Sequence, residues 1–279
     1  MIKDKTILVC GVGEEASATA RRLFGDGYAV VLHRSTAPHV LRRRMCFADA
    51  WFDGGANLDG IEARRADVSA ELLLGLRTRE FIPLLRGSFS EIVGRWPWDV
   101  IIAVHEEKEL PPPLRPLADV TIGLGSHFSA GVDCDLVVET EGPDPGAILR
   151  QGDPPRRRSA TTAQRRPEAL IVTAPAAGQF RSNLSIGAFA EPGELLGSID
   201  EIEIRAPKAG RIRGVARQKR TFGVGAPLVE IAFSPTARFV GVSDRSQLIS
   251  RGVSFAVEME CEGSAQGPIG NWWSNLSAE

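Results

Sequence analysis

Short apolar runs alternate with longer amphipathic segments over residues 1–150. The runs expected to form strands are Thr6–Cys10, Ala29–Leu32, Val100–Val104, Val120–Leu124 and Leu136–Glu139. Between the first two, Ala16, Ala20, Leu23 and Phe24 recur at helical spacing, which puts one apolar stripe on a helix. Strands that alternate with helices are typical of a parallel sheet covered by helices, so the pattern predicts an α/β domain over 1–150.

The pattern changes after residue 150. Residues 151–167 are rich in proline and arginine and have almost no large apolar side chain, which predicts a solvated linker. Residues 168–236 show short strand-like stretches broken by glycine and proline. Within them, Glu201-Ile202-Glu203-Ile204-Arg205 alternates with a period of two, as a half-buried strand does. Residues 237–279 form a C-terminal segment and a tail that contains two tryptophans.

An internal repeat lies in the β-rich region. The motif Ala174–Gly178 (APAAG) recurs thirty-two positions later as Ala206–Gly210 (APKAG), and each copy is followed by a strand-like stretch and a glycine turn. Two copies of one hairpin unit can bury their apolar faces against each other. This is the sequence form of an all-β barrel-sandwich of the biotinyl/lipoyl type. The expected hairpin tip, Ser198–Glu201, has no lysine for a cofactor arm. We therefore expect no biotin and no lipoate.

Composition narrows the classes of function. The formal net charge of −2 argues against a generic nucleic-acid binder. No stretch approaches the ~20 apolar residues that span a bilayer, so we expect no membrane segment. Four scattered cysteines include no C-x-x-C pair, which argues against a structural zinc site. The chain start is too short an apolar run for a signal peptide, so the prediction is a cytoplasmic protein with reduced thiols.

A glycine motif follows the first predicted strand. Gly11, Gly13 and Ala16 give the spacing G-x-G-x-x-A, which in a Rossmann-like domain lets a phosphate approach the backbone at a helix N-terminus. Glu14 at the start of that helix would compete with a phosphate. Arg34, at the end of the second strand, suits the 2′-phosphate of NADP. A dinucleotide site and a purely structural turn both remain open.

Two further segments contain candidate ligand-binding residues. Arg42 and Arg43 lie in a run of three arginines that could clamp a phosphate or a pterin phosphate, or else face water. The second candidate segment is the glycine-rich stretch that contains Gly123, Gly125, Ser126 and His127. Its loop is expected at the carboxyl end of a strand, where open α/β sheets bind ligands. His127 is either an acid/base group or a structural residue. We interpret His105-Glu106-Glu107-Lys108 as a solvated turn.

These segments, in their order, resemble the accessory family of the selenium-dependent molybdenum hydroxylase system. The resemblance is carried by the Gly11 loop, Arg42-Arg43 with Phe47–Ala50, the segment Ile82–Leu85, the signature IGLGSHFSAGVDCDLVVET over 122–140, the repeat APAAG…RAPKAG, and Val242–Arg245. The family is related in its first domain to the maturation chaperones of xanthine dehydrogenase and carbon monoxide dehydrogenase. The chain departs from the family's usual residues at several polar positions, which include His105–Lys108 and Ser126-His127.

The resemblance implies a maturation protein for a molybdenum-cofactor enzyme that binds a phosphorylated pterin or nucleotide, an accessory role rather than catalysis. Two alternatives are a non-catalytic assembly scaffold of a larger enzyme or cofactor pathway, and an NADP-dependent oxidoreductase. The ligand is unknown, with a molybdopterin-type cofactor or NADP as options. Trp272 and Trp273 are costly to leave in water, so we expect them to pack on the chain itself or to anchor a client protein.

Overall fold

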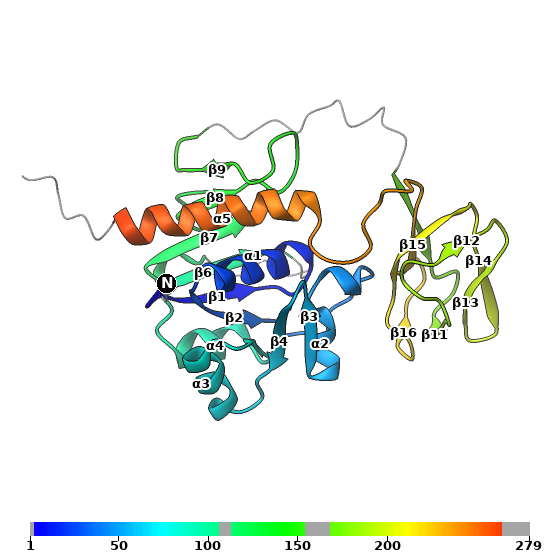
Figure 1. The fold of residues 1–279 in the computed structure, drawn as a ribbon, viewed down its shortest axis with the longest axis horizontal. Coiled ribbons are helices and arrows are strands. Elements are labelled where there is room, and N and C mark those ends of the chain that lie inside the picture. Colours follow the sequence, from blue (N-terminus) through cyan, green and yellow to red (C-terminus); the bar gives the residue numbers. More distant parts are fainter. Residues whose placement is uncertain (1–2, 106–112, 154–167, 264–279) are drawn as a thin grey trace, which may run out of the picture.

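The computed structural model describes residues 3–105, 113–153 and 168–263. It has a mixed α/β domain with one nine-stranded sheet and a smaller domain of antiparallel strands (Figure 1). The tail with Trp272 and Trp273 and most of the arginine-rich linker lie outside the described residues. In the part of the chain described, no helix has the length and apolar character that crossing a membrane requires.

The large sheet has the strand order β3-β4-β5-β2-β1-β6-β7-β8-β9, and its seven inner strands are parallel. The edge strands β3 and β9 pair antiparallel to their neighbours. The bounds are β1 Thr6–Cys10, β2 Ala29–His33, β3 Gly55–Leu58, β4 Ile61–Arg65, β5 Ile82–Leu85, β6 Val100–Val104, β7 Val120–Leu124, β8 Leu136–Val138 and β9 Ile148–Leu149.

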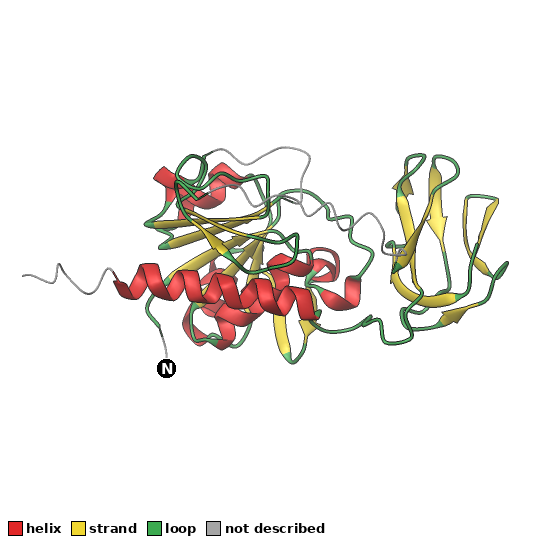
Figure 2. Cartoon of the chain, turned by 90° about the horizontal axis from the view of Figure 1, so that it is seen from above, coloured by secondary structure: helices red, strands yellow, loops and turns green. Residues whose placement is uncertain are grey.

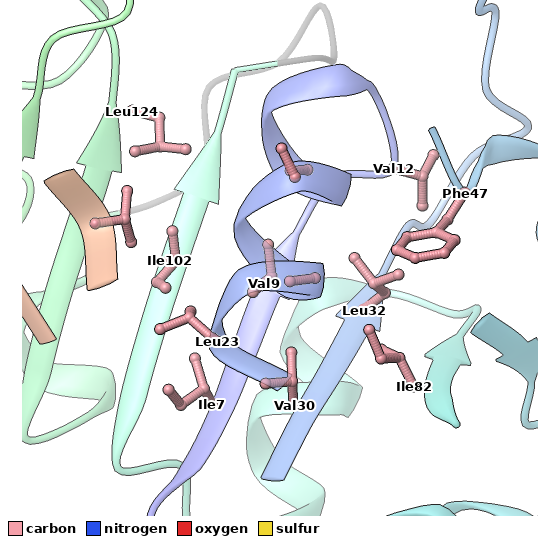
Figure 3. Packing of buried hydrophobic residues seen from close by; sticks show 14 of the residues in the cluster. Ile7, Val9, Val12, Leu23, Val30, Leu32, Phe47, Ile82, Ile102 and Leu124 are labelled. Carbon is pink, nitrogen blue, oxygen red and sulfur yellow. The ribbon is translucent and has the colours of Figure 1, made fainter. Parts of the chain in front are cut away.

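Helices cover both faces of this sheet (Figure 2). One face is covered by α1 (Glu14–Gly25) and α5 (Asp244–Gly263), which lie against each other (Figure 1). Figure 3 shows the core beneath α1, where Ile7 and Val9 of β1 and Leu23 of the helix belong to one cluster of buried side chains. The other face packs against α3 (Ser69–Thr78) and α4 (Phe89–Arg95), which bury Leu72 and Ile92. The remaining helices are α2 (Ala48–Asp53) and two short 3₁₀ turns, η1 (Arg43–Met45) and η2 (Arg115–Leu117).

The C-terminal helix α5 belongs to the core of the first domain, a contact that the sequence did not reveal. Ile249, Val253, Ala256 and Val257 are all buried in that core. Gly252 lies so close to the backbone of Gly146 that a Cβ atom would collide with its carbonyl oxygen. The chain therefore leaves the first domain, builds the second, and returns to complete the first.

The β-domain, which we define as residues 169–232, consists of two four-stranded sheets of orders β10-β17-β15-β12 and β14-β13-β11-β16. Its strands are β10 Ala169–Thr173, β11 Gly178–Arg181, β12 Phe189–Ala190, β13 Leu195–Ile199, β14 Ile202–Arg205, β15 Gly210–Val215, β16 Thr221–Phe222 and β17 Pro227–Ala232. Buried side chains from both sheets meet in one core.

The sequence repeat accounts for this arrangement. Strands β11 and β15, β12 and β16, and β13 and β17 begin thirty-two positions apart, and the two sheets list corresponding strands in the same order. The glycine turn of each copy is hydrogen-bonded to the other copy, so we call the turns exchanged. The Gly193 amide donates to the Ala206 oxygen at 2.7 Å, and the Gly225 amide donates to the Ala174 oxygen at 2.9 Å. The two copies thus bury their apolar faces against each other, as the repeat predicted.

Candidate functional site

The strand order of the large sheet reverses at β1. From β1 the chain crosses to β2 on one side, whereas from β6, on the other side of β1, it crosses away to β7. At such a point the loops after the two central strands diverge, and open parallel sheets bind ligands there, outside the carboxyl ends of the strands. We call this place the β1–β6 edge and define it by the loop Gly11–Gly13 and by His105 and His127, which follow β6 and β7.

The loop Gly11–Gly13 makes the turn from β1 into α1 that the motif predicted. The Gly11 amide donates to the His33 oxygen at 2.9 Å, and its φ of 140° is a conformation that favours glycine. Gly13 caps α1 with extended backbone (φ −71°, ψ −169°) and makes no side-chain cap. The first turn of α1 thus presents its N-terminus at the edge, where a phosphate would be stabilised by the helix dipole.

Arg42 is paired with two carboxylates from different parts of the chain. Its Nε and Nη2 each lie 2.6 Å from a carboxylate oxygen of Glu230 on β17, and its Nη1 lies 2.8 Å from Glu14 at the start of α1. The Glu230 side chain is only 3% exposed, and Arg213 lies 3.7 Å from it. This cluster joins the Gly11 loop to the β-domain, so the charge of Arg42 is already balanced by protein groups.

Burial and ion pairing shift the pKa values of Glu14 and Arg42 in this cluster. Desolvation raises the pKa of Glu14 above its usual range, against the opposing effect of the Arg42 charge. Desolvation alone would lower the pKa of Arg42, but its bonds to Glu230 and Glu14 raise it on balance. The negative charge of Glu14 at the edge is also offset by its ion pair with Arg42.

The other predicted cations are also engaged. Arg43 lies in η1, 3.4 Å from Asp49 of α2. Arg34 is buried, its Nε donates to the Thr36 oxygen at 3.2 Å, and its own carbonyl accepts from Trp51. The roles predicted for Arg34, Arg42 and Arg43 in anion binding stay predictions. What the structure adds is that the arginine segment also contacts the β-domain, because the Val215 amide donates to the Leu41 oxygen at 2.9 Å.

Packing explains two glycines of the glycine-rich segment, Gly123 within β7 and Gly125 in the loop that follows it. A Cβ at Gly123 would collide with the Phe128 ring. Gly125 has a φ of 91°, and a Cβ there would lie 2.8 Å from Thr140 Oγ1. The Gly125 amide donates to the Val138 oxygen at 2.9 Å. These contacts fold the loop back over the sheet and leave Ser126 and His127 exposed.

Two histidines meet at this edge. The rings of His105 and His127 are stacked, with centroids 4.1 Å apart and planes 29° apart. The Nδ1 atom of His105 is buried and has no hydrogen-bond partner in the described part of the chain. Burial lowers the pKa of His105, and the nearby His127 lowers it further. Sequence reasoning proposed His127 but took His105 for part of a solvated turn. The position of His105 directly after β6, beside the strand β7 that leads into the glycine-rich loop, was the feature of the sequence that could have indicated a site residue.

The neighbouring strand ends carry two more reactive groups. Cys10 pairs in register with His33 on one side and with Ala103 on the other. His33 Nε2 lies 3.0 Å from the Gly87 oxygen, which fixes its ring. Among the residues that the structure describes, no three histidine, cysteine or acidic side chains gather in a way that could hold a metal ion.

Comparison with known proteins shows what the chain is similar to. No protein-family model matches the chain. Over 262 residues the chain is 33% identical to the uncharacterized protein YqeB of Escherichia coli strain K12, and this match covers 91% of the chain and 47% of YqeB. The chain therefore spans about half the length of this curated relative.

Proposed function

We propose that the chain is an accessory protein that helps to mature a molybdenum-cofactor enzyme by holding a phosphorylated pterin or nucleotide at the β1–β6 edge. One observation carries the proposal. The turn Gly11–Gly13 and the N-terminus of α1 occupy the reversal point of a parallel sheet, where phosphates bind in folds of this kind. The resemblance to the molybdenum hydroxylase accessory family supplies the ligand class.

The same proposal includes the finer classification of the two domains. The first is a Rossmann-like domain, supported by the central strand order and the glycine turn. The second is a barrel-sandwich of the biotinyl/lipoyl type without an attached cofactor, supported by the exchanged repeat and by the tip Asp200-Glu201 between β13 and β14. A cytoplasmic location also belongs to the proposal, and the wide spacing of the four cysteines in the sequence, with no C-x-x-C pair, supports it.

Ligand identity is tested first by native mass spectrometry of the protein purified from its own host. We expect a phosphorylated pterin or nucleotide to be released on denaturation. Titration calorimetry with ADP and with NADP then measures affinity in the stripped protein. A protein that carries no such compound and binds neither probe would refute the proposal.

The position of the ligand is tested by Gly13→Ala. The extended backbone of Gly13 accepts an alanine without strain, so the added methyl group acts by blocking the approach of a phosphate. We expect ADP affinity to fall about tenfold or more. Gly94→Ala is the matched control, because nothing lies within 4 Å of a Cβ at Gly94. Equal ADP affinity in the two variants would place the ligand elsewhere.

A second candidate is a scaffold subunit of a larger assembly. Five large apolar side chains of the β-domain are about half exposed or more: Ile171 (46%), Phe189 (57%), Leu195 (48%), Ile202 (49%) and Val224 (73%). Exposed apolar side chains mark a protein-binding site where they form one contiguous patch. If this function is correct, Phe189→Ser together with Val224→Ser abolishes co-purification of a client while ADP binding persists. Retention of every partner would exclude it.

A further inference from the structure

The stacked pair His105 and His127 is placed to meet an anion. His105 follows β6 directly, and β6 is the neighbour of β1, whose carboxyl end turns into the glycine loop. Adjacent strands lie about 4.8 Å apart, so the pair and the loop border the same edge. His127 is exposed, and the buried Nδ1 of His105 has no hydrogen-bond partner among the residues that the structure describes. A buried polar atom without a partner is costly unless a ligand or water satisfies it.

The spacing of the rings makes their protonation interdependent. Two imidazolium charges at a centroid separation of 4.1 Å repel each other, so a charge on one ring opposes a second charge on the other. A phosphate brought next to the pair favours the charged form and would draw a proton onto it. Among the residues that the structure describes, the titratable groups at this edge also include Cys10 and His33 on the adjacent strand ends and Glu14, whose charge is paired with Arg42.

We propose that His105 and His127 bind the phosphate group of the ligand and take up one proton from solvent as it binds. The inference rests on the proposed function, because it requires a phosphorylated ligand at the β1–β6 edge. The pair then acts as one hydrogen-bonding unit, in which the protonated ring donates to the phosphate and the neutral ring stays stacked on it. Affinity follows the protonation of the pair and is greatest in weakly acidic solution.

Calorimetry with ADP as the probe tests this coupling. Titrations between about pH 6 and pH 8, in buffers of different ionisation enthalpy, count the protons taken up with each ADP. Uptake of one proton lowers the affinity about tenfold for each pH unit above the pKa of the free pair. His127→Gln changes an exposed side chain, so the fold is retained. We expect it to remove this slope and to cut affinity about tenfold in weakly acidic solution.

The control is His39→Gln, an exposed histidine that lies 3.0 Å from the Pro227 oxygen, in the contact with the β-domain. That variant should keep the slope of the wild type. The chain has four histidines, so NMR titration of their ring protons assigns the proton uptake to a residue. Failure of ADP to bind the wild type would overturn both the function and this inference. Binding of ADP with no pH slope, or a slope that survives His127→Gln, would overturn this inference alone.

Discussion

Replacing Arg42 by alanine should weaken the contact between the two domains. We expect it to lower the free energy of unfolding more than the loss of an exposed ion pair would. The substitution leaves the Glu230 carboxylate, 3% exposed, with Arg213 at 3.7 Å as its remaining cation. It also removes the partner of Glu14. Loss of one member of a buried ion pair costs about 3–5 kcal/mol, because a charge is left behind in a poorly solvated place. Since Arg213 compensates in part, we expect the free energy of unfolding to fall by about 3 kcal/mol.

The β-domain provides a matched control at the same bond length. Arg205 lies 2.6 Å from Glu203, as Arg42 lies from Glu230, but both members of this second pair are more than half exposed. Arg205 also donates one hydrogen bond to the Gly193 oxygen. Arg205→Ala should therefore cost no more than about 1 kcal/mol.

Urea unfolding of the full chain, followed by circular dichroism and by tryptophan fluorescence, measures both variants. All five tryptophans lie outside the β-domain, so the fluorescence follows the rest of the chain. The double variant Arg42→Met with Glu230→Leu removes both members of the closest pair and should recover part of the lost stability, because Glu14 and Arg213 still each lose a partner. Equal losses for Arg42→Ala and Arg205→Ala would refute the reasoning that burial makes the Arg42 pair important.

The remaining predictions concern packing, proton linkage and modification. Gly252→Ala should destabilise the chain by about 2 kcal/mol, because the added methyl group would collide with the Gly146 backbone. Gly94→Ala should be neutral or stabilise the chain by up to about 1 kcal/mol. Thermal unfolding compares the two variants, and equal effects on stability would contradict the contact between Gly252 and Gly146. Since burial raises the pKa of Glu14 above 4.5, the folded chain binds that proton more tightly than the unfolded chain, so this group's contribution to stability falls as pH rises through the folded pKa. Glu14→Gln should thus gain stability relative to wild type between pH 4.5 and neutrality by chemical denaturation, and a relative loss would contradict the shift. Intact-mass measurement after co-expression with biotin and lipoyl ligases should show no adduct, and an added mass would contradict the reading of the hairpin tip.

The central strands were predictable because parallel strands buried on both faces are continuous apolar runs. Strands β1, β6 and β7 have the predicted bounds, while β2 extends one residue further, to His33, and β8 stops one residue earlier, at Val138. The hairpin β3–β4 escaped prediction because it lies at the edge of the sheet, where Glu62 and Arg64 interrupt its apolar pattern. Local patterns record burial, so the least buried strands leave the weakest signal.

Helix α5 was missed for a related reason. Its buried face includes Ser246, Ser250 and Ser254 at intervals of four, which close packing allows but which lower the hydrophobic contrast of the helix. Such a face is visible only once α1 is known to lie against it.

Only the part of the candidate site that lies within one short segment of the chain could be predicted from the sequence. The glycine turn after β1 follows from motif spacing within one βα unit. The partners of Arg42 could not be foreseen, since Glu230 is distant in sequence and meets it only through the docking of the β-domain. The pairing of His105 with His127 likewise depends on the adjacency of β6 and β7.

The exchanged turns of the β-domain make each half of the repeat dependent on the other. A single unit would leave the Gly193 or Gly225 amide without its carbonyl partner and would expose one side of the shared core. An isolated copy would therefore need a second copy, related by a two-fold axis, and the domain has the form of such a homodimer fused into one polypeptide. During synthesis, the first copy cannot complete its bonds until the second has emerged, so a chain interrupted between them would present open strand edges to its neighbours.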